Sequence, residues 1–173
     1  MPGYRIIGIN HDDLADGSGK AGLTFETTND VLYKYIWNDT KTNVGGWRSS
    51  KLRARLNSGD LWALLPAELQ SKAKAVTKMT DNEGGGSAGT PTATNDKVFI
   101  LSTTEIYGDL QSDGAQYEYY ATSRYSGPEI VCYFSTRSVS PSDSTDFIYV
   151  DPFGRWSSGS ANSAGNVFPA WCF

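Results

Sequence analysis

The chain has 173 residues, a net charge of −4 and 39% hydrophobic residues. This length indicates one domain, residues 1–173, with a single sizeable core, and the 13% aromatic content excludes a disordered chain. No apolar run is long enough to insert into a membrane. Acidic residues outnumber basic ones by 19 to 15, which disfavours a nucleic-acid partner. The first five residues contain no apolar signal-peptide core.

The first third of the chain predicts a hairpin followed by helices. Residues 4–9 and 21–27 alternate between apolar and polar side chains, and the Gly/Asp-rich segment between them favours a turn. Residues 47–57 predict the best helix, with Ser49 or Ser50 as its cap and leucines stacked at i, i+4. A second helix is expected to begin near Pro66, since proline suits the first helical position.

The middle of the chain returns to strands. Residues 72–80 alternate as in a strand with one solvated face, whereas residues 81–96 are rich in Gly, Ser, Thr and Asn and predict a long loop. The apolar run Val98–Leu101 predicts a central strand. Ser102 and Glu105 have the spacing of a capping box, which predicts a short helical turn after that strand.

The last third predicts mostly strands and turns. Residues 117–125 are rich in tyrosine, and residues 130–136, 146–150 and 166–173 predict three strands separated by Ser-rich and Gly-rich turns. The order of strands, two helices and further strands predicts an α+β protein with an antiparallel core sheet.

Few residues are suited to metal or redox chemistry. One histidine, His11, and two cysteines, Cys132 and Cys172, are too few for a zinc site. Asp12 and Asp16 resemble a calcium loop only faintly, because a leucine occupies a ligand position between them and the closing Glu is absent. Both cysteines lie in apolar strand-like runs, so we expect two buried free thiols rather than a disulfide. No metal or cofactor is expected.

Several motifs in a fixed order resemble a widespread bacterial and prophage domain family of unknown function. They extend over nearly the whole chain and comprise Arg5–Leu14, Lys20–Phe25, the GGW-xxS-xLR-xxLN pattern of residues 45–57, Lys97–Ser102 with Glu105, Phe134–Ser138, Phe147–Val150 with Gly154, and Gly165–Phe173. Phe134 stands where the family more often has Trp, Val139 where it has Pro, and Asn166 adds a residue before Val167.

The resemblance implies a C-type-lectin-like fold akin to the formylglycine-generating enzymes, with two helices packed on a twisted antiparallel sheet and long loops. It also implies a relation to the variable proteins of diversity-generating retroelements, whose C-terminal segment binds ligand. Such domains occur in phage tails and as displayed binding modules. The formylglycine-generating activity is not implied, because it requires cysteine chemistry and both cysteines lie in strand-like runs.

Three catalytic or sugar-binding alternatives find little support in the residues. His11 beside Asp12 permits a Ser-His-Asp triad, but no serine lies in a G-x-S-x-G elbow, so a buried structural histidine paired with a carboxylate is favoured. Nineteen acidic residues permit a glycosidase-like pair without selecting one. Residues 37–39 spell the WND of calcium-dependent lectins, but early in the chain and without its usual partner motif.

A recognition surface is the favoured hypothesis, because tyrosine and tryptophan give rigid contact area while Ser and Asp give adaptable hydrogen bonds. Arg137, in contrast, is expected to bond backbone carbonyls through its fixed fork. The candidate ligand-binding residues follow Cys132: Tyr133, Ser135, Ser140, Ser142, Asp143, Ser144, Asp146, Tyr149, Asp151, Phe153, Arg155 and Trp156.

We therefore expect a non-enzymatic recognition module on a virion or cell surface, cytoplasmic before assembly, that binds a host-surface protein or glycan. The alternative is a structural or assembly domain of a virion protein, in which the chain could form a homo-oligomer. A hydrolase is the third and least favoured class.

Overall fold

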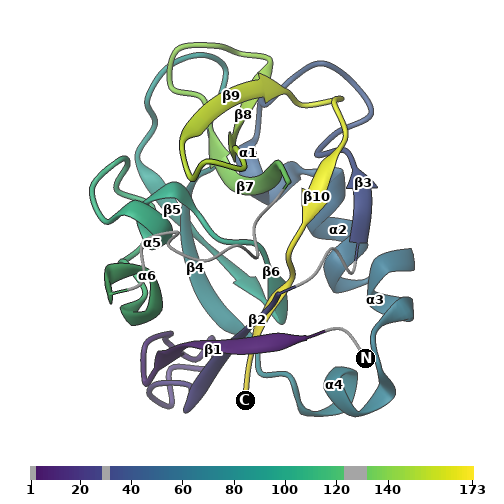
Figure 1. Cartoon of the computed structure of the whole chain (residues 1–173), viewed down its shortest axis with the longest axis vertical. Coiled ribbons are helices and arrows are strands. Elements are labelled where there is room, and N and C mark those ends of the chain that lie inside the picture. The colour runs from purple at the N-terminus through teal and green to yellow at the C-terminus, as the bar shows by residue number, and fades with distance from the viewer. Residues whose placement is uncertain (1–2, 29–31, 123–131) are drawn as a thin grey trace.

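The computed structural model describes residues 3–28, 32–122 and 132–173. Among the described residues, strands hold 34% and helices 20%, and these strands form three separate sheets (Figure 1). The expected α+β, C-type-lectin-like arrangement of two helices on one twisted antiparallel sheet is therefore wrong. In the described part of the chain the longest helix has seven residues, and none could span a membrane. Two predicted features, Tyr125 and residues 130–131 of a strand, lie outside the described residues.

A four-stranded antiparallel sheet contains the expected N-terminal hairpin. Its order is β1-β2-β11-β6, formed by Tyr4–Ile9, Leu23–Thr27, Ala170–Cys172 and Val98–Phe99. The predicted strand over residues 166–173 is divided between two sheets, because Pro169 cannot donate to a ladder and marks the break. The central strand predicted over residues 98–101 is shortened to its first two residues.

A five-stranded sheet occupies the upper part of the molecule (Figure 1). Its order is β3-β10-β7-β8-β9, formed by Leu32–Tyr35, Gly165–Val167, Phe134–Val139, Asp146–Val150 and Trp156–Ser160. All neighbours are antiparallel except β10 and β7, which are parallel. Strands β3 and β9 were not predicted from the sequence pattern.

The third sheet is a two-stranded ribbon of β4, Val76–Asp81, and β5, Pro91–Asp96. The two strands pair in continuous antiparallel register from Val76 opposite Asp96 to Asp81 opposite Pro91. The segment predicted as a long loop is therefore a strand in its last third, and the predicted strand over residues 72–80 begins later.

The helices are short and occupy the sides of the molecule (Figure 1). The predicted helix over residues 47–57 is two helices, because Ser50 is extended at ψ 140° and its side chain caps the second helix by accepting from the Arg53 N–H. The helices are α1 Gly46–Ser49, α2 Lys51–Asn57, α3 Asp60–Leu64, α4 Ala67–Lys72, α5 Thr103–Tyr107 and α6 Glu118–Thr122.

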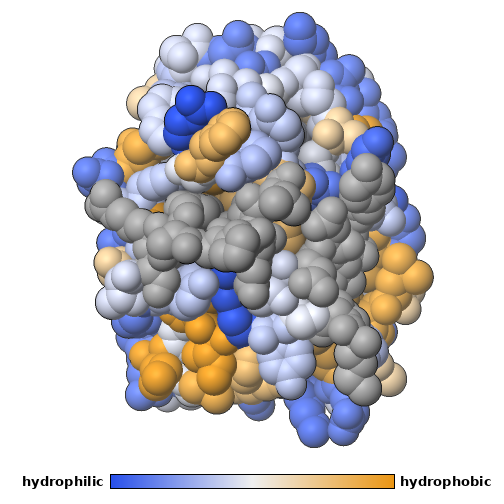
Figure 2. Space-filling view, in the orientation of Figure 1, coloured by the Kyte–Doolittle hydropathy of each residue, from blue (hydrophilic) through white to orange (hydrophobic). Residues whose placement is uncertain are grey.

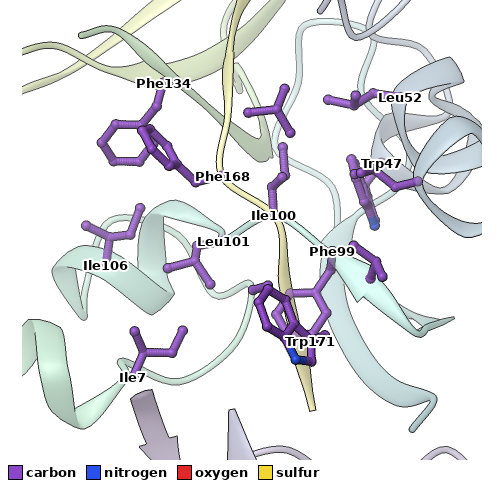
Figure 3. Packing of buried hydrophobic residues seen from close by; sticks show 14 of the residues in the cluster. Ile7, Trp47, Leu52, Phe99, Ile100, Leu101, Ile106, Phe134, Phe168 and Trp171 are labelled. Carbon is purple, nitrogen blue, oxygen red and sulfur yellow. The ribbon is translucent and has the colours of Figure 1, made fainter. Parts of the chain in front are cut away.

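One cluster of buried hydrophobic residues lies between the sheets and the helices (Figure 3). Trp47 and Leu52 enter it from α1 and α2, and Phe99 and Trp171 enter it from the four-stranded sheet. Phe134 from the five-stranded sheet packs edge to face on Phe168 at a centroid distance of 5.4 Å. This shared core holds the three sheets in one arrangement.

Candidate functional site

The candidate ligand-binding residues separate into two groups at opposite ends of β8. Five of them (Ser140, Ser142, Asp143, Ser144 and Asp146) lie at the turn that joins β7 to β8. The other seven lie toward the turn that joins β8 to β9, on that turn or on the strand ends beside it. A five-residue strand spans about 17 Å, so the structure does not bring all twelve together.

The group at the β7–β8 turn stabilises its own loop. The Asp143 carboxylate accepts bonds from the Thr145 N–H and hydroxyl at 2.7 and 2.6 Å, and these bonds lower its pKa. The amide of Asn43 donates to the carbonyls of Asp143 and Asp146, both at 2.7 Å. Ser140 is buried, with 3% of its surface exposed. These contacts assign the turn a structural task.

The β8–β9 turn holds aromatic side chains out into solvent. Asp151 accepts from the Phe153 N–H at 2.8 Å and from the Arg155 N–H at 2.9 Å, which closes the turn. Phe153 and Trp156 are 79% and 50% exposed, and the Arg155 guanidinium lies 4.9 Å from the centre of the Phe153 ring. In Figure 2 the surface where β9 begins carries an orange group beside a deep blue one. The hydrogen-bonded turn thus presents an apolar ring and a cationic side chain at its tip.

A small apolar pocket opens next to this turn, on one face of the five-stranded sheet. Its volume is about 220 Å³. Tyr133 and Tyr149 form one wall, with their rings edge to face at 5.5 Å. Trp37 stacks on Phe147 at 5.3 Å and is held by an indole N–H bond of 2.7 Å to the Thr136 carbonyl. The lining residues are Trp37, Tyr133, Phe134, Tyr149, Gly159, Ser163, Ala164 and Gly165.

Two glycines on flanking strands leave the space for this pocket. A Cβ at Gly159 in β9 would lie 3.1 Å from the Tyr149 ring, and a Cβ at Gly165 in β10 would lie 2.6 Å from the Ser135 hydroxyl oxygen. Ser135 lies directly opposite Tyr149 in the ladder, and its buried hydroxyl has no hydrogen-bond partner among the described residues. Any larger side chain at either glycine would reduce the pocket.

A second cavity, of about 300 Å³, is polar and lies between the N-terminal hairpin and β4. Three buried charged residues line this cavity: Asp12, Lys78 and Glu105. The Lys78 ammonium donates to Asp12 at 2.6 Å and to the Tyr117 phenol at 2.9 Å, and it pairs with Glu105 at 2.5 Å. Although burial opposes the effect, Glu105 and Asp12 raise the pKa of Lys78. The amine is therefore held as a cation between two carboxylates.

Arg137 extends this buried network toward the core. Its guanidinium bonds the Glu105 carboxylate and donates to the carbonyls of Ile100, Met79 and Asp113 at 2.9, 3.2 and 3.2 Å. The prediction that its fork bonds backbone carbonyls is confirmed. Although burial opposes the effect, Arg137 and Lys78 lower the pKa of Glu105. Glu105 and Arg137, which lie in the motifs that resemble the family, therefore stabilise the fold through this network.

His11 lies at the rim of the polar cavity and stacks on Tyr117 at 4.1 Å. One ring nitrogen is 3.2 Å from a Glu118 carboxylate oxygen and the other is 3.2 Å from the Ala115 carbonyl. Over the described ranges, no serine hydroxyl bonds this histidine. The pairing with a carboxylate is as expected, although the carboxylate is not that of Asp12.

The remaining sequence candidates have structural partners. Asp12 also accepts from Thr24 at 2.5 Å. Cys172 is a buried thiol whose pKa is raised to about 12 by burial, whereas Cys132 is only partly buried. Within the WND segment, the Asn38 side chain accepts from the Lys51 N–H at 3.0 Å. That segment therefore anchors α2.

Sequence patterns missed six pocket residues: Trp37, Phe134, Gly159, Ser163, Ala164 and Gly165. The only signal for Trp37 was the WND resemblance, which indicated a different chemistry. The glycines lie in segments that favour turns, and no sequence pattern separates a glycine that opens a pocket from one that permits a turn.

Comparisons with known proteins give one match. No curated protein and no solved structure matches the chain. A family described as a domain of unknown function, DUF6273, matches residues 21–173. This range includes every pocket residue and begins after β1. It also agrees with the resemblance to a domain family of unknown function. The chain belongs to the DUF6273 family.

Proposed function

We propose that this protein is a non-enzymatic recognition module that binds a protein or glycan partner through the β8–β9 end of its five-stranded sheet. A virion or cell surface that contacts a host is the context we propose for it. We define the binding region as Tyr133 and Tyr149 with the pocket that they line, together with Phe153 and Trp156 at the same end of β8.

One observation carries this proposal: exposed aromatic side chains lie at one end of the five-stranded sheet, and one of them, Tyr133, lines a preformed pocket. Tyr133, Phe153 and Trp156 are 56%, 79% and 50% exposed. Aromatic residues in and around pockets dominate binding energy at protein interfaces, and large exposed apolar groups are otherwise a cost to a monomer. The charged groups of the polar cavity, by contrast, are paired with one another, so they favour stability over chemistry.

The test removes two aromatic side chains and measures binding to intact host cells and to a glycan array. We expect Tyr149→Ala/Trp156→Ala to weaken binding at least about tenfold, since aromatic contacts of this kind are worth more than about 1.4 kcal/mol. Ser142→Ala, at the exposed turn on the far end of β8, is the matched control and should bind as wild type does. Unchanged binding by the double variant, with its fold intact by circular dichroism, would refute the proposal.

A further inference from the structure

Strand β9 is an edge strand without the usual protection. Among the described residues it pairs only with β8, over five consecutive positions without a bulge. Its sequence, Trp-Ser-Ser-Gly-Ser, contains no charged residue and no proline. Proteins normally protect an edge with charges, prolines or bulges, because unpaired N–H and C=O groups recruit another strand. Edge strand β1 follows that rule, since it carries Arg5 and a register shift between Ile6 and Gly8.

The apolar pocket lies on a face of the sheet to which a strand added beside β9 would contribute alternate side chains. Ser157 pairs with Tyr149 and Gly159 pairs with Phe147, so all four side-chain positions share one face. A strand beside β9 would direct alternate side chains over that face. Because Gly159 has no side chain, the neighbouring residue of the added strand can reach across it toward Tyr149 and Trp37.

The lining of the pocket selects the kind of side chain. Among the described residues that line the pocket, Tyr133 and Tyr149 contribute phenol hydroxyls and Ser163 contributes one further hydroxyl. The indole N–H of Trp37 is already bonded to the Thr136 carbonyl. A sugar ring would have to bury several hydroxyls there without partners, which costs free energy. At about 220 Å³ the pocket is smaller than the ~300 Å³ lower bound for drug-sized ligands, so it suits one side chain. Its aromatic walls favour an aromatic ring, which would pack offset or edge to face.

A second copy of the chain does not meet these requirements. If β9 paired with its own copy, that copy would offer only Ser157 and Gly159 on the pocket face. Neither is large enough to fill the pocket, so its apolar walls would remain solvated or empty.

We infer that β9 is a docking edge for an extended segment of a different polypeptide, which adds a sixth strand and places one aromatic side chain in the Tyr133–Tyr149 pocket. The inference rests on the proposed function and names the partner's class, because only a polypeptide backbone supplies alternating N–H and C=O groups for the ladder.

The experiment selects binders from a displayed library of short random peptides and maps the bound peptide by NMR. We expect enrichment of extended sequences with an aromatic residue flanked by β-formers. Bound peptide should protect the amides of Trp156 and Ser158, which point away from β8, from hydrogen exchange, whereas the alternate amides of Ser157 and Gly159 face β8. Ser158→Lys, which places a charge on the edge strand, and Gly159→Val, which reduces the pocket, should each weaken binding about tenfold or more. Ser142→Lys is the matched control and should leave affinity unchanged.

The outcomes separate this inference from the proposed function. Peptides that bind without protecting β9, or that bind Ser158→Lys and wild type equally, overturn the docking edge but not recognition at the binding region. Glycan binding that Tyr149→Ala abolishes, with no peptide enriched, does the same. A concentration-dependent dimer that Ser158→Lys dissociates would identify a second copy as the occupant and overturn the inference. If no probe binds and cell binding ignores the aromatic variants, both proposals fail.

Discussion

Gly46 illustrates how one residue can be required for two reasons. Its φ of +52° is in the left-handed region, and a Cβ there would overlap the Asp81 carbonyl at the end of β4. Gly85 has a φ of +78°, but its nearest neighbour, a Val44 methyl, is 3.9 Å from the position of an added Cβ. Left-handed strain alone costs about 1–2 kcal/mol. We expect Gly85→Ala to lower the free energy of unfolding by that amount and Gly46→Ala by more than about 3 kcal/mol, both measured in urea. Equal losses would mean that the close approach to Asp81 contributes nothing.

For single residues, the sequence predicted the bonding role of a side chain better than its position in the fold. The structural task of Arg137 followed from the geometry of its guanidinium, which matches fixed acceptors wherever they lie. The candidate binding residues were chosen by type, so the set included Asp143, which closes its own turn, and Ser135, which is buried. Which of them share a surface depends on the register of β7, β8 and β9, and residue type carries no information on register.

Helix α5 is the element that local sequence determines most fully. The Ser102 hydroxyl accepts from the Glu105 N–H at 3.1 Å, and Glu105 accepts from the Ser102 N–H at 3.0 Å, which is the predicted capping box. The same hydroxyl donates to the Asp113 carbonyl at 2.6 Å. We expect Ser102→Ala to lower the free energy of unfolding by about 1–2 kcal/mol. Ser71→Ala, on an exposed part of α4, is the control. A loss near zero in urea unfolding would show that the cap is dispensable.

Other elements could not be predicted because their partners define them. Strand β9 has neither β-branched residues nor apolar alternation, and it is extended because it pairs with β8 from Trp156 opposite Val150 onward. Likewise β5 pairs with β4 although the Pro, Asn and Asp in its sequence, Pro-Thr-Ala-Thr-Asn-Asp, disfavour a strand. In both cases a tertiary contact outweighs a weak local preference.

The balance of buried charge makes the whole molecule sensitive to acid. Lys78 lowers the pKa of Asp12, and Arg137 with Lys78 lowers that of Glu105, in each case against the effect of burial. A carboxyl with a lower pKa in the folded chain stabilises the fold above its unfolded pKa, near 4, and that contribution is lost as pH falls. Burial raises the pKa of Glu26, so its protonation offsets part of this loss. We expect the free energy of unfolding to fall as pH decreases from about 5 to about 2.

Urea unfolding at several pH values measures this dependence. Asp12→Asn should be less stable near neutral pH and should show a shallower decline in acid, because it removes one carboxyl that must be protonated. Identical slopes for wild type and variant would exclude Asp12 as a source of the acid sensitivity.

The overall architecture was the least predictable feature. The hairpin, the helical region around residues 47–57 and strand β8 follow from the sequence pattern, but the assignment of strands to sheets does not. Strands β10 and β11 are separated by two residues, yet they join different sheets. Elements of an α+β pattern thus assemble into three small sheets, which motif order alone did not reveal.

The position of β11 has a consequence for how the protein forms in the cell. Residues 170–172 insert between β2 and β6, which come from the first and the middle parts of the chain. During vectorial synthesis β2 and β6 leave the ribosome without the strand that joins them, so their edges stay open until residues 170–172 have also left the ribosome. Such late pairing between distant segments slows folding and leaves unpaired strand edges that are prone to aggregation. Nascent chains halted before residue 170 should therefore depend on chaperones that shield open strands.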